Sequence, residues 1–563
     1  MSLCESSDGI VFPNLDNSSK PPSKRSTTTT ARSIYQTAID AAADNENKSS
    51  FQIPPNKKWR YGYQPTVVHT SHLMTAHSSN PLTMARAALQ HAHTTFQFRR
   101  SGFPEMSLQE ACTQDTFTGS FVTGDSTSST ATSAASSTTS TDPRFTGVPY
   151  RGKEYRGAEL IDLAQSFADY GQAEPSFALA IKNIMNTDTL KKGLADKVFI
   201  LIGATSEMGP TQSLLDLGAT VIALARPSSK RDPDKWKRLI NKAVNSSGTM
   251  LYPTRSTDAS VAGAGADALV DTPEIINWLC ELSNSHPMVQ NKQMYIYSGI
   301  YLDGGMFVRA SMAMEMIISE LTKRLIQIPN LIYIDTPSHA HIVDLATYTG
   351  GIDQQQHAPF LMKLMASCGI IKKNKCILNP SGRKDVVVMN MLATQQGPNY
   401  ALAKFIQRFR AIWSRHSETL LFPNDQNKGK LVVIYISNGM FPKQYSNLTL
   451  LKIKLLFLLF YFFNISFTIL DLCLFSFVPV DLKKAKQLVS ITLGPGAKTE
   501  SVMHSSTMAM VMNTMDAIKP NVAHEPETVQ TMMTLIMIND ITSKTALGNP
   551  NVNSTYHTDF LGK

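Results

Sequence analysis

The chain has 563 residues, of which 42% are hydrophobic and 17% charged, and its formal net charge at neutral pH is +9. This length gives room for a large core and for two or three folding units. The charge alone would suggest a nucleic-acid partner, but the chain has no dense Lys/Arg block with interleaved aromatics, so we expect none. The 6 cysteines form no CxxC pair, which argues against a zinc ribbon or a disulfide framework and favours the cytoplasm.

The amino-terminal part of the chain differs in composition from the rest. Residues 126–141 contain only Ser, Thr and Ala, which cannot bury enough apolar surface to offset the entropy of the chain. We therefore expect residues 1–145 to be a low-complexity, largely disordered region without a secretory signal. The globular domain is expected over 146–418 and 487–545, with a tail over 546–563.

A strand, a glycine turn, a helix and a second strand then follow in direct succession. The apolar run Val198–Ile202 predicts a buried strand, Gly203–Gly209 a turn, and Thr220–Ala225 the next strand, with leucines at helical spacing between them. Such a turn presents backbone N–H groups and the positive end of a helix dipole to a diphosphate. The unit therefore predicts nucleotide binding, against the plainer alternative of a turn whose glycines serve only the backbone.

The residues after the second strand indicate which dinucleotide is preferred. Sites for NAD usually place an acid there, whereas the 2′-phosphate of NADP requires cations. Arg226 and Lys230 follow this strand, and no acid occurs before Asp232. We therefore expect NADP rather than NAD, the alternative being an ordinary basic surface loop.

Strands and helices continue to alternate downstream. Further strands are expected to begin at Thr249, Gln293, Asn330, Lys384 and Leu488. This alternation predicts an α/β fold with a doubly wound, mostly parallel sheet.

The turn GATSEMG is similar to the cofactor loop of the short-chain dehydrogenase/reductases, usually G-x-x-x-G-x-G. Gly203 and Gly209 match the outer glycines, and Glu207 replaces the middle one. The resemblance covers roughly residues 157–540 with interruptions, and it implies a Rossmann-like NAD(P)-binding domain. The remaining cofactor contacts that it implies in the turn are Thr205, Ser206 and Met208.

The resemblance also implies cofactor contacts outside the turn. Asp258 would lie by the adenine ring, and Ser298 and Gly299 would border the nicotinamide side of the crevice. The pair Pro495–Gly496 with Thr499 resembles the family's Pro-Gly element, whose threonine contacts the carboxamide side of the nicotinamide.

Tyr400 and Lys404 stand four residues apart, which puts them on one face of a helix. The ammonium favours the phenolate form, so the pair can exchange a proton with a developing alkoxide. In the family, the tyrosine of this YxxxK pattern is the general acid or base, and the lysine also holds the nicotinamide ribose. The family's carbonyl-polarising serine has no counterpart before Tyr400, and Thr394 is the expected substitute.

We therefore expect an NADP-dependent oxidoreductase that acts on a small-molecule carbonyl or alcohol. A catalytically inactive nucleotide-binding protein with a sensing or assembly role is the alternative. His339 and His341 lack a third ligand at recognisable spacing, so no metal is expected. Whether the chain forms a homo-oligomer is left open.

One segment conflicts with a single nucleotide-binding domain. Leu455–Pro479 is long and apolar enough to span a bilayer, yet it lies between Tyr400 and Pro495, which the resemblance places in one domain. We expect part of 419–486 to be an insertion, such as a translated intron. A membrane anchor and a native core helix are the alternatives.

Overall fold

The computed structural model describes the central part of the chain and several separate segments. The described residues are 8–14, 25–43, 51–76, 80–114, 121–126, 147–150, 152–169, 175–186, 190, 193–206, 209–255, 261–325, 329–335, 338, 340–344, 360, 364, 367, 376–378, 386–390, 397–421, 431–435, 531–532, 534–535, 537–538 and 541.

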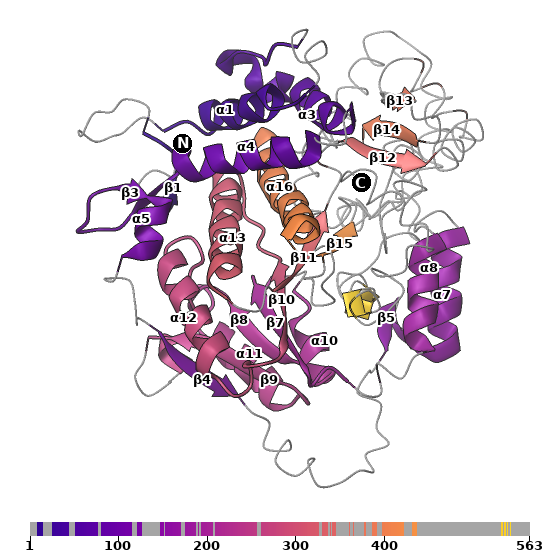
Figure 1. Ribbon diagram of the computed structural model, residues 1–563. Helices are drawn as coiled ribbons and strands as arrows, with labels where there is room; N and C mark the ends of the chain where they lie inside the picture. Colours follow the sequence, from indigo (N-terminus) through magenta and orange to yellow (C-terminus); the bar gives the residue numbers. More distant parts are fainter. Residues whose placement is uncertain are drawn as a thin grey trace, which may run out of the picture.

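A sheet with the strand order β15-β11-β10-β7-β8-β9-β4 forms the centre of the fold (Figure 1). Its strands are β4 (Val122–Ser126), β7 (Lys197–Ile202), β8 (Thr220–Leu224), β9 (Thr249–Thr254), β10 (Gln293–Ser298), β11 (Asn330–Asp335) and β15 (Leu431–Tyr435). All neighbouring pairs are parallel except β4 with β9. The parallel strands follow the order 3-2-1-4-5-6 of doubly wound dinucleotide-binding sheets. The predicted mixed α/β fold with a mostly parallel sheet is confirmed, and it is compatible with a Rossmann-like arrangement.

Alternate side chains of β7 enter two separate cores, one on each face of the sheet. Val198, Ile200 and Ile202 belong to one core, whereas Phe199 and Leu201 belong to the other. The first core includes α12 (Thr272–Ser285), α13 (Gly305–Arg324) and α16 (Pro398–Leu421). The second includes α7 (Gly157–Asp169), α8 (Pro175–Met185), α10 (Thr211–Asp216) and α11 (Lys235–Val244). Burial on both faces explains why this strand is a continuous apolar run.

The described residues between 8 and 114 form an N-terminal cap that packs into the first core. Its elements are β1 (Gly9–Val11), α1 (Thr27–Asp40), η1 (Asn56–Lys58), α3 (Trp59–Ala76), α4 (Asn80–Thr95), β2 (Gln97–Arg99), β3 (Met106–Ser107) and α5 (Leu108–Thr113). Figure 1 shows α1, α3 and α4 lying over the ends of α13 and α16. Tyr35, Trp59 and Phe96 of the cap are each at most 1% exposed.

The cap corrects the expectation of a largely disordered region over 1–145. The Ser/Thr/Ala run cannot form a core, but the segments before it carry apolar and aromatic side chains. The composition of the run therefore does not predict disorder for those segments. Most of that run, residues 127–141, lies outside the described residues. Ser126, its first residue, ends the edge strand β4 of the central sheet.

Arg309 of α13 and a glycine hold β1 against the sheet domain. The Arg309 side chain donates to the carbonyl oxygens of Ile10 and Asp8, and the Ile10 N–H donates to the Leu269 carbonyl oxygen at 3.0 Å. Gly9 has φ +95°, and a Cβ there would lie 2.1 Å from the Leu269 oxygen. Only glycine fits this approach.

The strand expected from Lys384 lies outside the central sheet. It forms β14 (Val386–Asn390), which pairs antiparallel with β12 (Ala340–Asp344) and β13 (Cys376–Leu378). The described residues also include a hairpin, β5 (Val148–Tyr150) with β6 (Lys153–Tyr155), and the short helix η3 (Val261–Gly263). A strand-like sequence alone does not say which sheet it joins.

Part of the expected insertion belongs to the fold. Helix α16 continues to Leu421, and β15 pairs with β11, so 419–421 and 431–435 are elements of the structure. This corrects the boundary set at residue 419. Leu455–Pro479 and the strand expected from Leu488 lie outside the described residues. Among the helices that are described, none is long and apolar enough to cross a membrane.

We predict that Gly9→Ala lowers the free energy of unfolding by about 3 kcal/mol, because backbone strain adds to a clash that pushes β1 away from Leu269. Chemical denaturation followed by tryptophan fluorescence measures the loss. Gly102→Ala is the matched control, because Gly102 has φ +87° but no atom within 4 Å of an added Cβ. It should lose about 1 kcal/mol from strain alone. Equal losses would contradict the packing role of Gly9.

Candidate functional site

A cavity of about 190 Å³ lies at the carboxyl ends of β7, β8 and β10. Its walls come from the turn after β7, the end of β8, Ala266–Leu269 and Ile300–Leu302. The strand order reverses between β7 and β10, and doubly wound sheets bind their ligands at such a reversal. The position of the cavity is therefore that of a ligand site.

The turn after β7 is held to β8 and approaches the end of β10. The N–H groups of Gly203 and Ala204 both donate to the Leu224 carbonyl oxygen, at 2.9 and 3.0 Å. Gly203 has φ +100°, and a Cβ there would lie 3.0 Å from the backbone of Gly299 and Ile300. The first glycine of the motif thus permits a close approach of two loops.

The same turn presents an unpaired hydroxyl group. The Oγ atom of Ser206 is buried, has no hydrogen-bond partner within the described structure and belongs to a residue that lines the cavity. Thr205 also lines the cavity and is exposed. Gly209 closes the turn by donating from its N–H to the Ser206 carbonyl oxygen at 2.9 Å. A buried donor without a partner is costly unless a ligand or water satisfies it.

Arg226 and Lys235 bring positive charge to the cavity wall. The Nε atom of Arg226 lies 3.2 Å from a carboxylate oxygen of Asp267. The Nζ atom of Lys235 donates to the Pro227 carbonyl oxygen at 3.2 Å, and burial lowers the pKa of this lysine. Lys230, singled out from the sequence, is exposed and does not line the cavity.

Among the described residues that line the cavity, the acid is Asp267, which the sequence did not single out. Its carboxylate accepts from the Leu269 N–H at 3.0 Å, which holds it at the wall. The chain passes beyond the end of β9 and then returns, with the Ala266 N–H donating to the Ala225 carbonyl oxygen at 2.9 Å. Counting from the strand end therefore reached Asp258, which lies outside the described residues.

Tyr400 and Lys404 share one face of α16, as their spacing predicts. The Lys404 ammonium lies 6.0 Å from the Tyr400 ring centroid and 5.8 Å from that of Phe307. It donates to Oε1 of Gln407 at 3.2 Å. Tyr301, which lines the cavity, has its ring centroid 5.9 Å from that of Tyr400. The Tyr301 ring thus lies between the cavity and the Tyr400–Lys404 pair.

The structure separates Ser298 from the cavity. Its Oγ donates to the Met314 sulfur at 2.9 Å and its residue is 5% exposed, so the hydroxyl group faces α13. Gly299 lies beside Gly203 and donates from its N–H to the Ile202 carbonyl oxygen at 3.0 Å. The other predicted site residues lie outside the described part of the chain, as does Glu207; they are Met208, Thr394, Pro495, Gly496 and Thr499.

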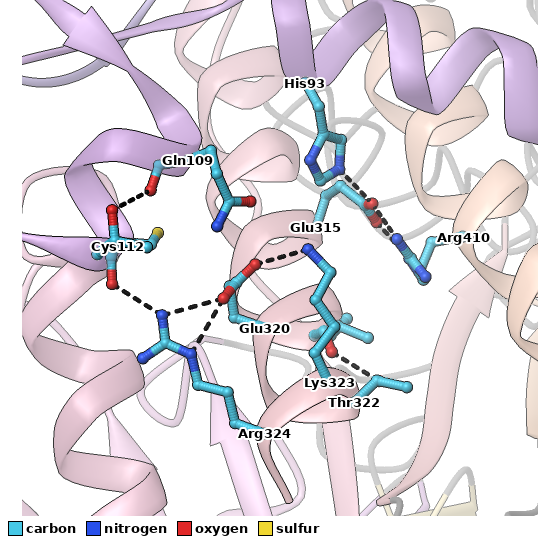
Figure 2. Close-up of polar contacts among 11 residues, drawn as sticks. His93, Gln109, Cys112, Glu315, Glu320, Thr322, Lys323, Arg324 and Arg410 are labelled. Carbon is cyan, nitrogen blue, oxygen red and sulfur yellow. Dashed lines mark hydrogen bonds and ion pairs between the residues drawn. The ribbon is translucent and has the colours of Figure 1, made fainter.

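Buried polar contacts join α13 to α16 and to the cap (Figure 2). Arg410 of α16 donates from Nε to Oε2 of Glu315 at 2.7 Å, and His93 of α4 lies 2.7 Å from the other carboxylate oxygen. Gln407 donates to Ser311 at 3.2 Å one turn away. Burial opposes ionisation of Glu315, but Arg410 and His93 together hold its pKa at about 2. These contacts fix the helix that carries Tyr400 and Lys404.

A second cluster in Figure 2 ties α5 to the end of α13. Glu320 accepts from Lys323 at 2.7 Å and from Arg324 at 3.0 Å, and Arg324 donates to the Cys112 carbonyl oxygen at 2.7 Å. Burial raises the pKa of the Cys112 thiol to about 12, so this cysteine is not a reactive nucleophile. The described residues hold no group of three His, Cys, Asp or Glu side chains that could bind a metal.

No protein-family model, curated protein or solved structure matches this chain. The site therefore has to be interpreted from its own geometry and chemistry.

We predict that the acid sensitivity of the fold depends on Glu315. Its depressed pKa contributes stability that is fully present above about 4.5 and is lost as the pH falls towards about 2. Glu315→Gln should flatten the dependence of the urea midpoint on pH below 5, and should cost about 3 kcal/mol at pH 7 by removing the buried carboxylate that pairs with Arg410. Glu281→Gln, at an exposed position of α12, is the control. Parallel pH profiles for both variants and the wild type would contradict the assignment.

Proposed function

We propose that the chain is an NADP-dependent oxidoreductase of the short-chain dehydrogenase/reductase type with a Rossmann-like fold. Its reaction is hydride transfer to or from a small-molecule carbonyl or alcohol. The observation that carries the proposal is a cavity at the reversal of the strand order, with cations on one wall and the Tyr400–Lys404 pair one ring away from another.

The residues around the cavity suit the adenosine diphosphate half of a dinucleotide. Gly203 leaves room beside the turn, and the unpaired Ser206 hydroxyl is a donor for a phosphate oxygen. The N–H groups of Gly203 and Ala204 are already used by Leu224, so they are not available to a diphosphate. We therefore assign the phosphate contact in this turn to the Ser206 hydroxyl group and not to the N–H groups of Gly203 and Ala204.

The choice between NADP and NAD depends on the balance of charge at the wall. Arg226 and Lys235 would hold a 2′-phosphate, and among the described lining residues these two cations exceed the one carboxylate, that of Asp267. The lowered pKa of Lys235 reflects burial, and an anion beside it would favour its charged form. The predicted preference for NADP is thus kept, with Lys235 in place of Lys230.

Tyr400 and Lys404 would handle the proton. A bound NADPH would supply the hydride in the reducing direction. The Tyr400 hydroxyl would then give its proton to the alkoxide oxygen of the substrate, which becomes the alcohol. The Lys404 ammonium favours the phenolate left on Tyr400, which regains a proton from solvent. Thr394 remains the proposed polariser of the carbonyl.

One observation favours the alternative of a binding protein without catalysis. Lys404 donates to Gln407, and the Tyr400 ring is packed against Tyr301 and Phe307, so the pair is held within an aromatic cluster. A protein of this kind would bind NADPH and show no turnover.

We predict that Lys235→Ala and Arg226→Ala each weaken NADPH binding by about tenfold or more, because each removes a charge-assisted hydrogen bond to the 2′-phosphate. The affinity for NADH should change little. Lys230→Ala is the matched control, since this lysine is exposed outside the cavity and should leave NADPH affinity unchanged. Calorimetric titration measures all three variants. Equal affinities of the unmodified protein for NADPH and NADH would refute the assignment.

We predict that Tyr400→Phe lowers turnover by about 10²- to 10⁴-fold while leaving NADPH affinity within about twofold, because only the proton donor is removed. Loss of NADPH absorbance with a panel of ketones and aldehydes measures the rate. Tyr295→Phe, which removes a hydroxyl group bonded to Gln293 at 2.7 Å, is the control. Full activity in the Tyr400 variant would place the acid elsewhere, and NADPH binding without turnover of any substrate would favour the binding protein.

A further inference from the structure

Tyr301 stands between the cavity and the proposed proton donor. It lines the cavity on the side of β10, and its ring centroid lies 5.2 Å from that of Phe307 and 5.9 Å from that of Tyr400. The third distance of this cluster, from Phe307 to Tyr400, is 5.3 Å. The three rings are therefore in mutual contact, and Tyr301 is the member that faces the cavity.

The size of the cavity agrees with this boundary. Its volume is about 190 Å³, whereas sites that enclose a complete drug-sized ligand have about 300–1,000 Å³. The residues proposed above to bind the adenosine half of the dinucleotide all precede Tyr301 in the sequence and line this cavity. A dinucleotide is too large for this space, and the proposed role of Tyr400 would put its nicotinamide half beyond Tyr301.

We infer that Tyr301 is a specificity-determining residue that separates the two halves of the crevice. With the ring in its present position the cavity accepts an adenosine phosphate, and the nicotinamide half enters only when the ring leaves Tyr400 and Phe307. This inference rests on the proposed function and adds a division of the same site into two compartments.

The position of Tyr301 in the chain allows such a movement. Phe307 and Tyr400 are on the helices α13 and α16, and Phe307 is 1% exposed. Tyr301 is half-buried on the loop between Gly299 and Gly304. Gly299 is tied to β7, but Gly304 has φ +59° and open space around it. Gly304 is also the N-cap of α13, and its carbonyl oxygen accepts from the Phe307 N–H at 3.2 Å, so the ring moves with a short loop that is anchored at both ends.

Calorimetric titration of the full chain with 2′,5′-ADP and with NADPH tests the inference. The first probe has only the adenosine half and the second has both. Tyr301→Ala should raise the affinity for NADPH about tenfold relative to that for 2′,5′-ADP, because two ring contacts no longer have to be broken. Tyr301→Phe keeps the ring and should give the wild-type ratio. Tyr301→Leu, a smaller change, serves if the alanine variant does not fold.

The outcomes separate this inference from the proposed function. An unchanged ratio of the two affinities in Tyr301→Ala, or in Tyr301→Leu where the alanine variant does not fold, overturns the inference while the proposed cofactor stands. A fall in that ratio also overturns it, since the ring would then be a contact for the nicotinamide. If the wild type binds neither probe, the proposed function fails and the inference fails with it.

Discussion

Most of the chain serves one requirement, which is the burial of β7 on both faces. Val198, Ile200 and Ile202 face one way and Phe199 and Leu201 the other, so neither side of the strand can be left to water. A parallel sheet of this kind needs two helical layers. On one side α7, α8, α10 and α11 provide the layer, and on the other α12, α13 and α16 do so.

The layer of α12, α13 and α16 contains buried charged side chains that require hydrogen-bond or ion-pair partners. Arg309, Glu315 and Glu320 of α13 are each at most 2% exposed, and an unpaired charge in such a position costs several kcal/mol. The cap supplies partners directly to two of them, since Arg309 donates to the carbonyl oxygens of Ile10 and Asp8 and His93 meets Glu315. Glu320 is paired within α13 by Lys323 and Arg324, and the cap meets Arg324 through the Cys112 carbonyl oxygen. The cap is therefore required by the chemistry of α13, and it completes the domain instead of lying beside it.

Local patterns predicted much of the sheet but little of what joins distant segments. The strands at Val198, Thr220, Gln293 and Asn330 were found because continuous apolar runs bounded by turns have few other interpretations. The helix face shared by Tyr400 and Lys404 followed from spacing alone. The sheet that the strand after Lys384 joins did not follow from the local sequence, because the partners of a strand are set by the whole topology.

The site residues that the sequence missed have one cause in common. Asp267 and Lys235 reach the cavity after the chain has left the sheet and returned, so their distance from a strand end says nothing about their place. Glu315 and Arg410 are 95 residues apart, and neither carries a local pattern that names the other. Composition also failed to predict the folded cap, because the low-complexity run at 126–141 does not represent the segments before it.

Leu269 belongs to two parts of the molecule at once. Its carbonyl oxygen accepts the N–H of Ile10, and the same residue forms part of the cavity wall. If contact of a ligand with this wall favours the seated position of β1, then the seating of β1 favours the ligand by the same free energy. A chain trimmed at its amino end, or one translated from a later start, would keep every residue of the βαβ unit and yet have a differently shaped pocket.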